Sequence, residues 1–138
     1  MIRLYKKGKR EQVSDHFWST DFDCPCKQPD CRVTSISVSL IDKLETLRSL
    51  AGQPVTVDKG GGCRCEWYEK DLGSRGMRIA KKLSQHILGK AADISIPGLS
   101  GAEIESLARR VGFRAVGVAK NWAHVDERDD EDRRWIYP

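Results

Sequence analysis

Hydrophobic and polar positions follow a helical period most clearly over residues 38–51. Polar side chains fill one side of this stretch, and Gly52 and Pro54 are typical of a helix end. We therefore predict a helix over 38–51 and a short strand over 55–57. The apolar stripe recurs every three or four positions, at Leu40, Ile41, Leu44, Leu47, Leu50 and Ala51.

The second half of the chain alternates shorter elements. Residues 91–96 form an apolar run that predicts a strand, and residues 114–119 and 122–127 predict two strands of a hairpin. Between them, Ser100 and Glu103 match a capping box and predict the start of a helix. This order of elements indicates a small α+β domain, with a mostly antiparallel sheet flanked by helices.

The remaining segments lack a clear period. Residues 1–35 are expected to be irregular and to pack on the domain through apolar anchors such as Phe17 and Phe22. The glycines of 59–62 predict a flexible loop, and residues 79–83 predict a helical turn. The charged tail, 129–138, carries apolar side chains and is expected to pack back on the sheet.

Length and composition limit the classes of protein. With 138 residues and 39% hydrophobic side chains, the chain fits one domain over 1–138. No apolar run approaches the roughly 18 residues of a membrane helix. Residues 1–12 are basic without an apolar core, so we expect no signal peptide and synthesis in the cytoplasm. The net charge of +4 is modest, and no basic, aromatic-lined stripe predicts a nucleic-acid partner.

The five cysteines gather in two short stretches, at positions 24, 26 and 31 and at positions 63 and 65. Three states remain open: reduced thiols, a zinc site of four thiolates, or disulfides between the two stretches. If the cysteines are structural, we expect Cys24, Cys26, Cys31, Cys63 and Cys65 to lie near one another. They would then tie the N-terminal segment to the loop before Arg64.

Two histidines and a carboxylate suggest metal chemistry. Asp93 is polar within an otherwise apolar strand, where an unpaired carboxylate would be costly to bury. In the alternating strand that follows, Trp122, His124 and Asp126 share one face. Together with His86, such groups can hold a zinc ion by three ligands and leave a position open for water.

The spacing of these residues carries a resemblance to a family. Residues 84–93 read Ser-x-His-x-x-Gly-x-Ala-x-Asp, and residues 124–128 read His-Val-Asp-x-Arg. This pair of motifs resembles the M15 zinc peptidases, which include D-alanyl-D-alanine carboxypeptidases and phage endolysins, and in particular their short His-Val-Asp-x-Arg branch. The similarity extends from about Phe17 to Arg128. It implies a hedgehog/DD-peptidase-like α+β fold.

The resemblance also implies roles for single residues. His86, Asp93 and His124 match the ligands of a catalytic Zn²⁺. Arg64 matches an arginine that neutralises charge on the substrate or the tetrahedral intermediate, and Ser84 matches a serine that binds substrate or positions the first ligand. The implied function is zinc-dependent hydrolysis of peptide bonds in peptidoglycan stem peptides, by a carboxypeptidase or an endopeptidase.

One position departs from the family pattern. Many M15 enzymes carry an acidic general base three residues before the last histidine, where this chain has Asn121. Asp126 is the nearest candidate to replace it, either as the base or as a residue that orients a zinc ligand. Glu127 should point to the opposite face of the strand. The alternative function is a weak or inactive zinc-binding homologue that acts as a cell-wall-binding or structural module.

The resemblance finally suggests a setting for the protein. The expected partner is a peptidoglycan peptide, and we expect a monomer. A wall-cleaving enzyme without a signal peptide would need another route to its substrate. Phage endolysins and virion-borne lysins have such a route, which favours a phage or prophage origin, with release to the cell wall or association with the virion.

Overall fold

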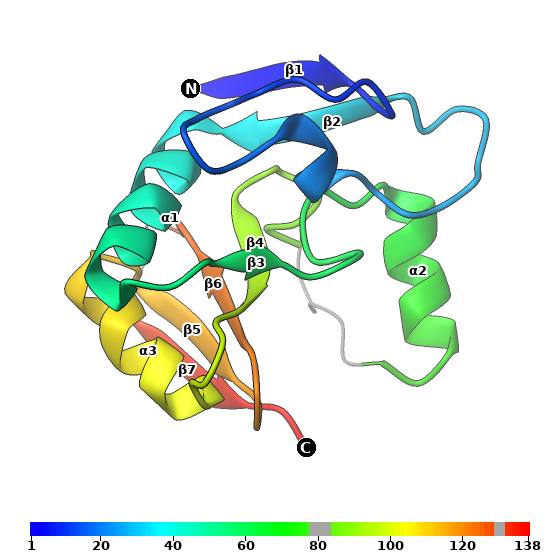
Figure 1. Cartoon of the computed structure of the whole chain (residues 1–138). Helices are drawn as coiled ribbons and strands as arrows, with labels where there is room; N and C mark the ends of the chain where they lie inside the picture. The colour runs from blue at the N-terminus through cyan, green and yellow to red at the C-terminus, as the bar shows by residue number, and fades with distance from the viewer. Residues whose placement is uncertain (78–83, 129–131) are drawn as a thin grey trace.

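The computed structural model describes residues 1–77, 84–128 and 132–138. Two sheets and three α-helices make up this described part of the chain (Figure 1). In chain order, the elements are β1 (Ile2–Lys6), the 3-10 helix η1 (Ser19–Phe22), β2 (Val33–Ser37), α1 (Val38–Ala51), β3 (Thr56–Val57), α2 (Glu66–Ser74), β4 (Ala91–Ser95), α3 (Gly101–Arg110), β5 (Ala115–Val118), β6 (Ala123–Asp126) and β7 (Arg133–Ile136).

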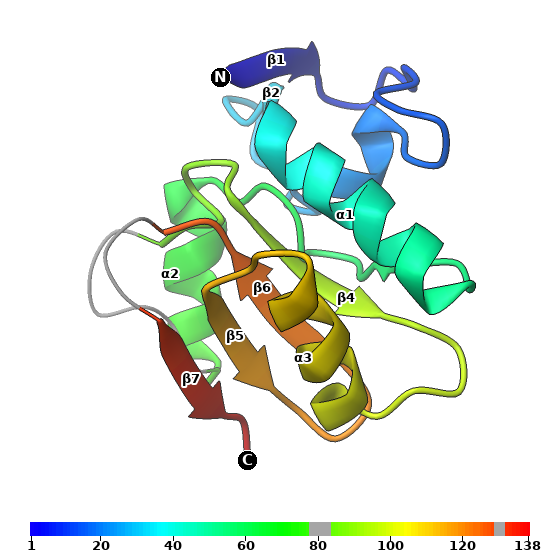
Figure 2. The same ribbon diagram turned by 90° about the vertical axis from the view of Figure 1, so that its left-hand side faces the viewer.

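The larger sheet has the strand order β3-β4-β6-β5-β7. Every neighbouring pair is antiparallel except β5 and β7, which run parallel. Helices α1 and α3 lie on one side of this sheet and α2 on the other (Figures 1 and 2). The predicted α+β domain with a mostly antiparallel sheet is confirmed.

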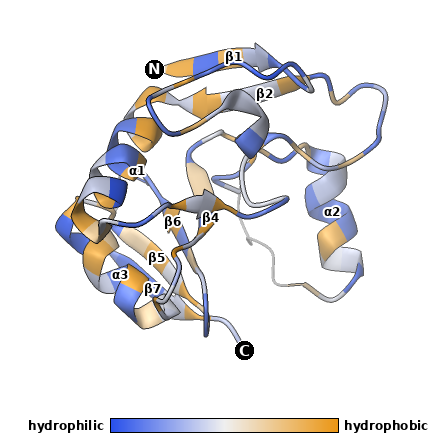
Figure 3. Cartoon of the chain, in the orientation of Figure 1, coloured by the Kyte–Doolittle hydropathy of each residue, from blue (hydrophilic) through white to orange (hydrophobic). Residues whose placement is uncertain are grey.

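Local signals explain the two helices that the sequence predicts. The Ser37 hydroxyl caps α1 by accepting a hydrogen bond from the Leu40 amide at 3.4 Å, and Gly52 ends the helix in the left-handed conformation at φ 65°. The capping box of Ser100 and Glu103 is present at the start of α3. Both helices carry hydrophobic and hydrophilic positions (Figure 3). Their buried apolar side chains pack in the core between the helices and the sheet.

The N-terminal segment is more regular than predicted. Strands β1 and β2 form an antiparallel pair in which Ile2 lies opposite Ser37. The prediction of an irregular segment over 1–35 is therefore wrong for both strands. The reason is that β1 is almost fully exposed and its partner lies far along the chain, so no local alternation marks it. Phe17 and Phe22 do anchor the segment, since each is only 1% exposed.

Helix α2 was not predicted at all. Glu69 is its single buried residue, so the helix has no apolar stripe to reveal it. The helical turn predicted over 79–83 lies outside the described residues. The loop over 59–62, which was expected to be flexible, is instead packed, because Gly60, Gly61 and Gly62 are all buried.

The tail packs back on the sheet as predicted, because β7 pairs with β5. Gly117 of β5 lies against the Trp135 and Tyr137 rings, which occupy the space that a side chain at 117 would need. Among the described residues, none of the helices combines the length and the apolar character needed to cross a membrane.

Candidate metal centre

His86, Asp93 and His124 come together at the middle of the larger sheet. Asp93 of β4 lies directly opposite His124 of β6, and His86 belongs to the turn that precedes β4. The Asp93 Oδ1 atom lies 3.3 Å from His86 Nε2 and 3.0 Å from His124 Nδ1. The two ring nitrogens are 3.2 Å apart. The predicted ligand set thus converges on one point.

The donor set and its spacing suit a zinc ion. Zinc takes imidazole nitrogen and carboxylate oxygen at about 2.0–2.2 Å, so tetrahedral ligands lie roughly 3.3 Å apart. The three separations in the structure match this edge length. Three protein ligands also leave a fourth position for water or substrate, as in catalytic zinc sites.

The backbone around His86 sets its ring orientation. The His86 Nδ1 atom lies 2.8 Å from the Gly62 carbonyl oxygen, and this acceptor requires the proton on Nδ1. The lone pair on Nε2 then faces the other two ligands. The Ser84 hydroxyl accepts a hydrogen bond from the His86 amide at 3.2 Å. Ser84 therefore fixes the backbone at the first candidate ligand, and its contact with substrate stays a prediction.

Gly89 allows the His86 turn to approach β2. It has φ 73°, and a Cβ atom there would lie 2.5 Å from the Ser35 carbonyl oxygen. Any side chain at this position would push the turn away from the strand. The small residue in the first motif thus allows the turn that carries His86 to lie close against β2.

A buried carboxylate, that of Asp126, binds the second ring nitrogen of His124. The His124 Nε2 atom donates to Asp126 Oδ2 at 2.7 Å, and the Nδ1 atom faces His86 Nε2 and Asp93 Oδ1. Asp126 is fully buried and also accepts from the Arg128 guanidinium, at 2.9 Å on Oδ1 and 2.7 Å on Oδ2. Arg128 and Asp126 together orient the second histidine.

Glu127 lies on the opposite face of the strand, as predicted. Its carboxylate accepts from the Ser37 hydroxyl at 2.6 Å and pairs with Lys43 Nζ at 3.3 Å. Asn121, by contrast, lies at the exposed turn between β5 and β6. The prediction that Asp126 and Glu127 point to opposite faces is therefore correct.

Arg64 contacts the centre through Asp93. Its Nη2 atom lies 3.0 Å from Asp93 Oδ2, the oxygen that faces away from the histidines, and its Nη1 atom lies 3.1 Å from Glu69 Oε2. Glu69 was missed by sequence reasoning, because no motif surrounds it and α2 itself gave no signal. The Arg64 amide also donates to the His86 carbonyl at 3.2 Å. Arg64 thus links α2 to two of the candidate ligands, His86 and Asp93.

The charges of the centre depend strongly on one another. Burial would raise the pKa of Asp93, but His86 and His124 outweigh it and hold this pKa well below its usual range. The pKa of Asp126 is also lowered, because the hydrogen bonds from Arg128 and His124 outweigh its burial. For His124, burial lowers the pKa, but hydrogen bonds to Asp126 and Asp93 raise it to about 8. Both carboxylates are therefore anionic at neutral pH.

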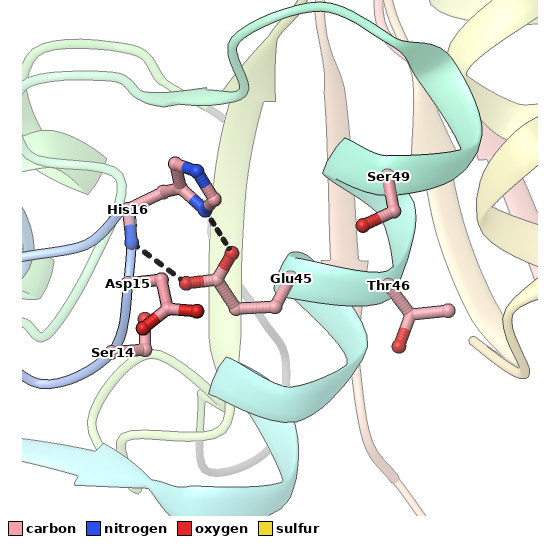
Figure 4. A pocket seen from close by; sticks show the side chains of 6 residues that line it. All are labelled: Ser14, Asp15, His16, Glu45, Thr46 and Ser49. Atoms are coloured by element: carbon pink, nitrogen blue, oxygen red, sulfur yellow. Dashed lines mark hydrogen bonds and ion pairs between the residues drawn. The ribbon is translucent and has the colours of Figure 1, made fainter.

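The third histidine lies elsewhere. His16 donates its amide to Glu45 Oε2 at 2.8 Å, and its Nδ1 atom lies 2.7 Å from Glu45 Oε1 (Figure 4). The pair lines a surface hollow between the N-terminal segment and α1, together with polar side chains only. It ties the N-terminal segment to the helix and contributes nothing to the metal group.

A small α+β domain that gathers two imidazoles and one carboxylate has the ligand set of a mononuclear zinc hydrolase. The comparison with protein families names the class more closely. A family model described as Peptidase M15 matches residues 15–126, a range that contains Arg64 and all three candidate ligands. The chain belongs to the M15 peptidase family. No curated protein and no solved structure matches it, so the hedgehog/DD-peptidase-like fold and the short branch stay predictions.

Proposed function

We propose that this protein is a zinc-dependent peptidase that hydrolyses peptide bonds in peptidoglycan stem peptides. The observation that carries the proposal is the convergence of His86 Nε2, Asp93 Oδ1 and His124 Nδ1 in a chain of the M15 peptidase family. These three residues would hold the zinc ion. When bound, zinc supplies a Lewis acid for the scissile carbonyl and lowers the pKa of bound water towards about 7.

The chain's own residues prepare the site for this chemistry. Asp126 and the Gly62 carbonyl fix the two imidazoles in the tautomers that present a lone pair to the metal. The Arg64 guanidinium forms an ion pair with Asp93 Oδ2. A cation beside the metal ligands would also favour the negative charge that develops on a tetrahedral intermediate.

The general base is the open step of the mechanism. Asn121 cannot accept a proton, and both Asp126 oxygens already accept hydrogen bonds from His124 and Arg128. Asp126 is also fully buried behind His124. These contacts support a positioning role for Asp126 more than the role of base.

Asn121 also favours a second candidate function, a zinc-binding homologue without turnover that acts as a cell-wall-binding or structural module. Mass spectrometry of muropeptides digested with the zinc-loaded protein separates the two functions. We expect new peptide fragments from purified peptidoglycan, and their masses identify the bond that is cleaved. The matched control is the His86→Ala variant, which should leave the muropeptides intact. Unchanged muropeptides with the zinc-loaded wild type would refute the peptidase.

A further inference from the structure

Four of the five cysteines form a second group of metal-ligand type, away from the histidines. The Sγ atoms of Cys24, Cys26, Cys31 and Cys65 all lie within 4.8 Å of one another. The cysteines are free thiols, not disulfides. Cys63 does not belong to the group, so the prediction that all five cysteines gather together is correct only for the other four.

The separations between the sulfur atoms match a tetrahedral metal site. Cys65 Sγ lies 3.8 Å from Cys24 Sγ and 3.6 Å from Cys26 Sγ. With a zinc–sulfur bond of about 2.3 Å, the edge of a tetrahedron of thiolates is about 3.8 Å. A disulfide requires about 2.05 Å between its sulfur atoms. The thiols therefore have the spacing of ligands around one ion.

The surroundings of the group favour thiolates. Cys65 is the residue that caps the N-terminus of α2, and its Sγ atom accepts a hydrogen bond from the Tyr68 amide at 3.4 Å. Lys7 Nζ lies 3.6 Å from Cys26 Sγ and donates to the Cys26 carbonyl at 2.8 Å. Four thiolates around Zn²⁺ carry a net charge of −2, and a helix N-terminus and a lysine offset part of it.

We propose that Cys24, Cys26, Cys31 and Cys65 bind a structural zinc ion that is separate from the catalytic centre. Four protein ligands fill a tetrahedral zinc ion completely and leave no position for water, which is the mark of a structural site. Cys24 and Cys26 are almost fully buried, as expected of ligands that form part of the protein interior.

The position of the site explains what it stabilises. Three of its ligands lie in the connection between η1 and β2, and this connection passes the N-terminal end of α2, where the fourth ligand lies (Figure 1). The fourth ligand follows Arg64 directly and ends the loop over 60–65. That loop accepts hydrogen bonds from His86 and Asp93, through the Gly62 and Gly61 carbonyls. The site thus fastens the loop that supports two catalytic ligands.

Metal analysis in a background without the catalytic ligands tests the proposal. The double variant His86→Ala/His124→Ala removes the catalytic site and should retain one zinc ion per chain. Adding Cys31→Ser should remove that ion. Adding Cys63→Ser instead should leave it in place, because this buried cysteine lies outside the group. Circular dichroism of each variant checks that it is folded.

Cobalt replacement gives a reading that does not depend on the cysteine variants. Co²⁺ bound to the double variant should show thiolate-to-metal charge-transfer absorption and the intense visible bands of tetrahedral cobalt. A folded double variant that binds neither zinc nor cobalt would overturn the proposal, and so would a disulfide among the four cysteines in the protein purified with zinc. If the double variant does not fold, the wild-type background decides: loss of one zinc ion per chain in Cys31→Ser supports the site, and a zinc content that Cys31→Ser leaves unchanged overturns it. Peptidase activity enters none of these outcomes.

Discussion

The contacts of Asp126 predict what its loss of charge does. In Asp126→Asn, the side chain keeps its shape, but one oxygen becomes an amide NH₂ group. Asp126 now accepts from His124 on one oxygen and from Arg128 on both. In either orientation the NH₂ group faces an Arg128 donor. At the Oδ1 position it would meet both the Arg128 amide and Nε, whereas at the Oδ2 position it meets only Nη2 and lies against His124 Nε2. The second orientation loses fewer contacts, because His124 Nε2 can accept a hydrogen bond from the NH₂ group.

That change reverses the tautomer of the second histidine. When Nε2 accepts a hydrogen bond, the neutral ring carries its proton on Nδ1, the atom that faces His86 and Asp93. Nδ1 then has no lone pair for a metal. We expect zinc affinity to fall by roughly 10–100-fold, the usual cost of losing a residue that orients a ligand, or about 1.4–2.7 kcal/mol. Excess zinc should restore much of the turnover.

The assay measures zinc affinity by competition with a chelator, and turnover at saturating zinc, on the same preparation. The matched control is Glu127→Gln, which removes the same charge from the next residue on the opposite face, where its partners are Ser37 and Lys43. Normal affinity with a loss of roughly 10²–10⁴-fold in turnover would make Asp126 the general base and refute the positioning role. Normal affinity with full turnover would refute both roles.

Three further predictions concern other contacts. Arg64→Lys keeps the charge but loses the planar fork that joins two carboxylates, so turnover should fall by roughly 10–100-fold in steady-state kinetics; wild-type rates would remove Arg64 from the site. Gly89→Ala should lower the free energy of unfolding in urea by more than about 1–3 kcal/mol, because the new Cβ atom would meet the Ser35 backbone in addition to the strain of a positive φ. Gly98→Ala is the control, since Gly98 has a similar φ and open space around it. Equal losses of stability in the two variants would contradict the close approach of Gly89 to β2. Burial would raise the pKa of Glu45, but the hydrogen bonds from His16 lower it. The stabilisation that Glu45→Gln removes, about 0–1 kcal/mol for a partly exposed pair, should therefore be present at neutral pH and disappear as the pH falls through the pKa of the folded state; a difference between the two proteins that persists in acid would argue against this pair.

Local sequence was sufficient for the elements whose signals lie within one stretch of chain. The apolar stripe, the serine cap and the glycine stop define α1, and the capping box defines the start of α3. Each depends on neighbours within a few residues, so it can be read without knowing the fold. The candidate ligands were also found from the sequence, because the spacing within two short motifs carries them.

Tertiary structure decided everything that depends on pairing between distant segments. The antiparallel register of β4 and β6 sets Asp93 opposite His124, and the bonds to Asp126 and Gly62 select the ring nitrogens that converge. The exposed strand β1, the polar helix α2 and the role of Glu69 left no periodic trace. The two cysteine stretches allowed thiols, disulfides or a metal, and only the fold shows four sulfur atoms at the spacing of a tetrahedron. Periodicity reports which side of an element is buried, whereas a site is made by the partners that meet there, and these are brought together only when the whole chain packs.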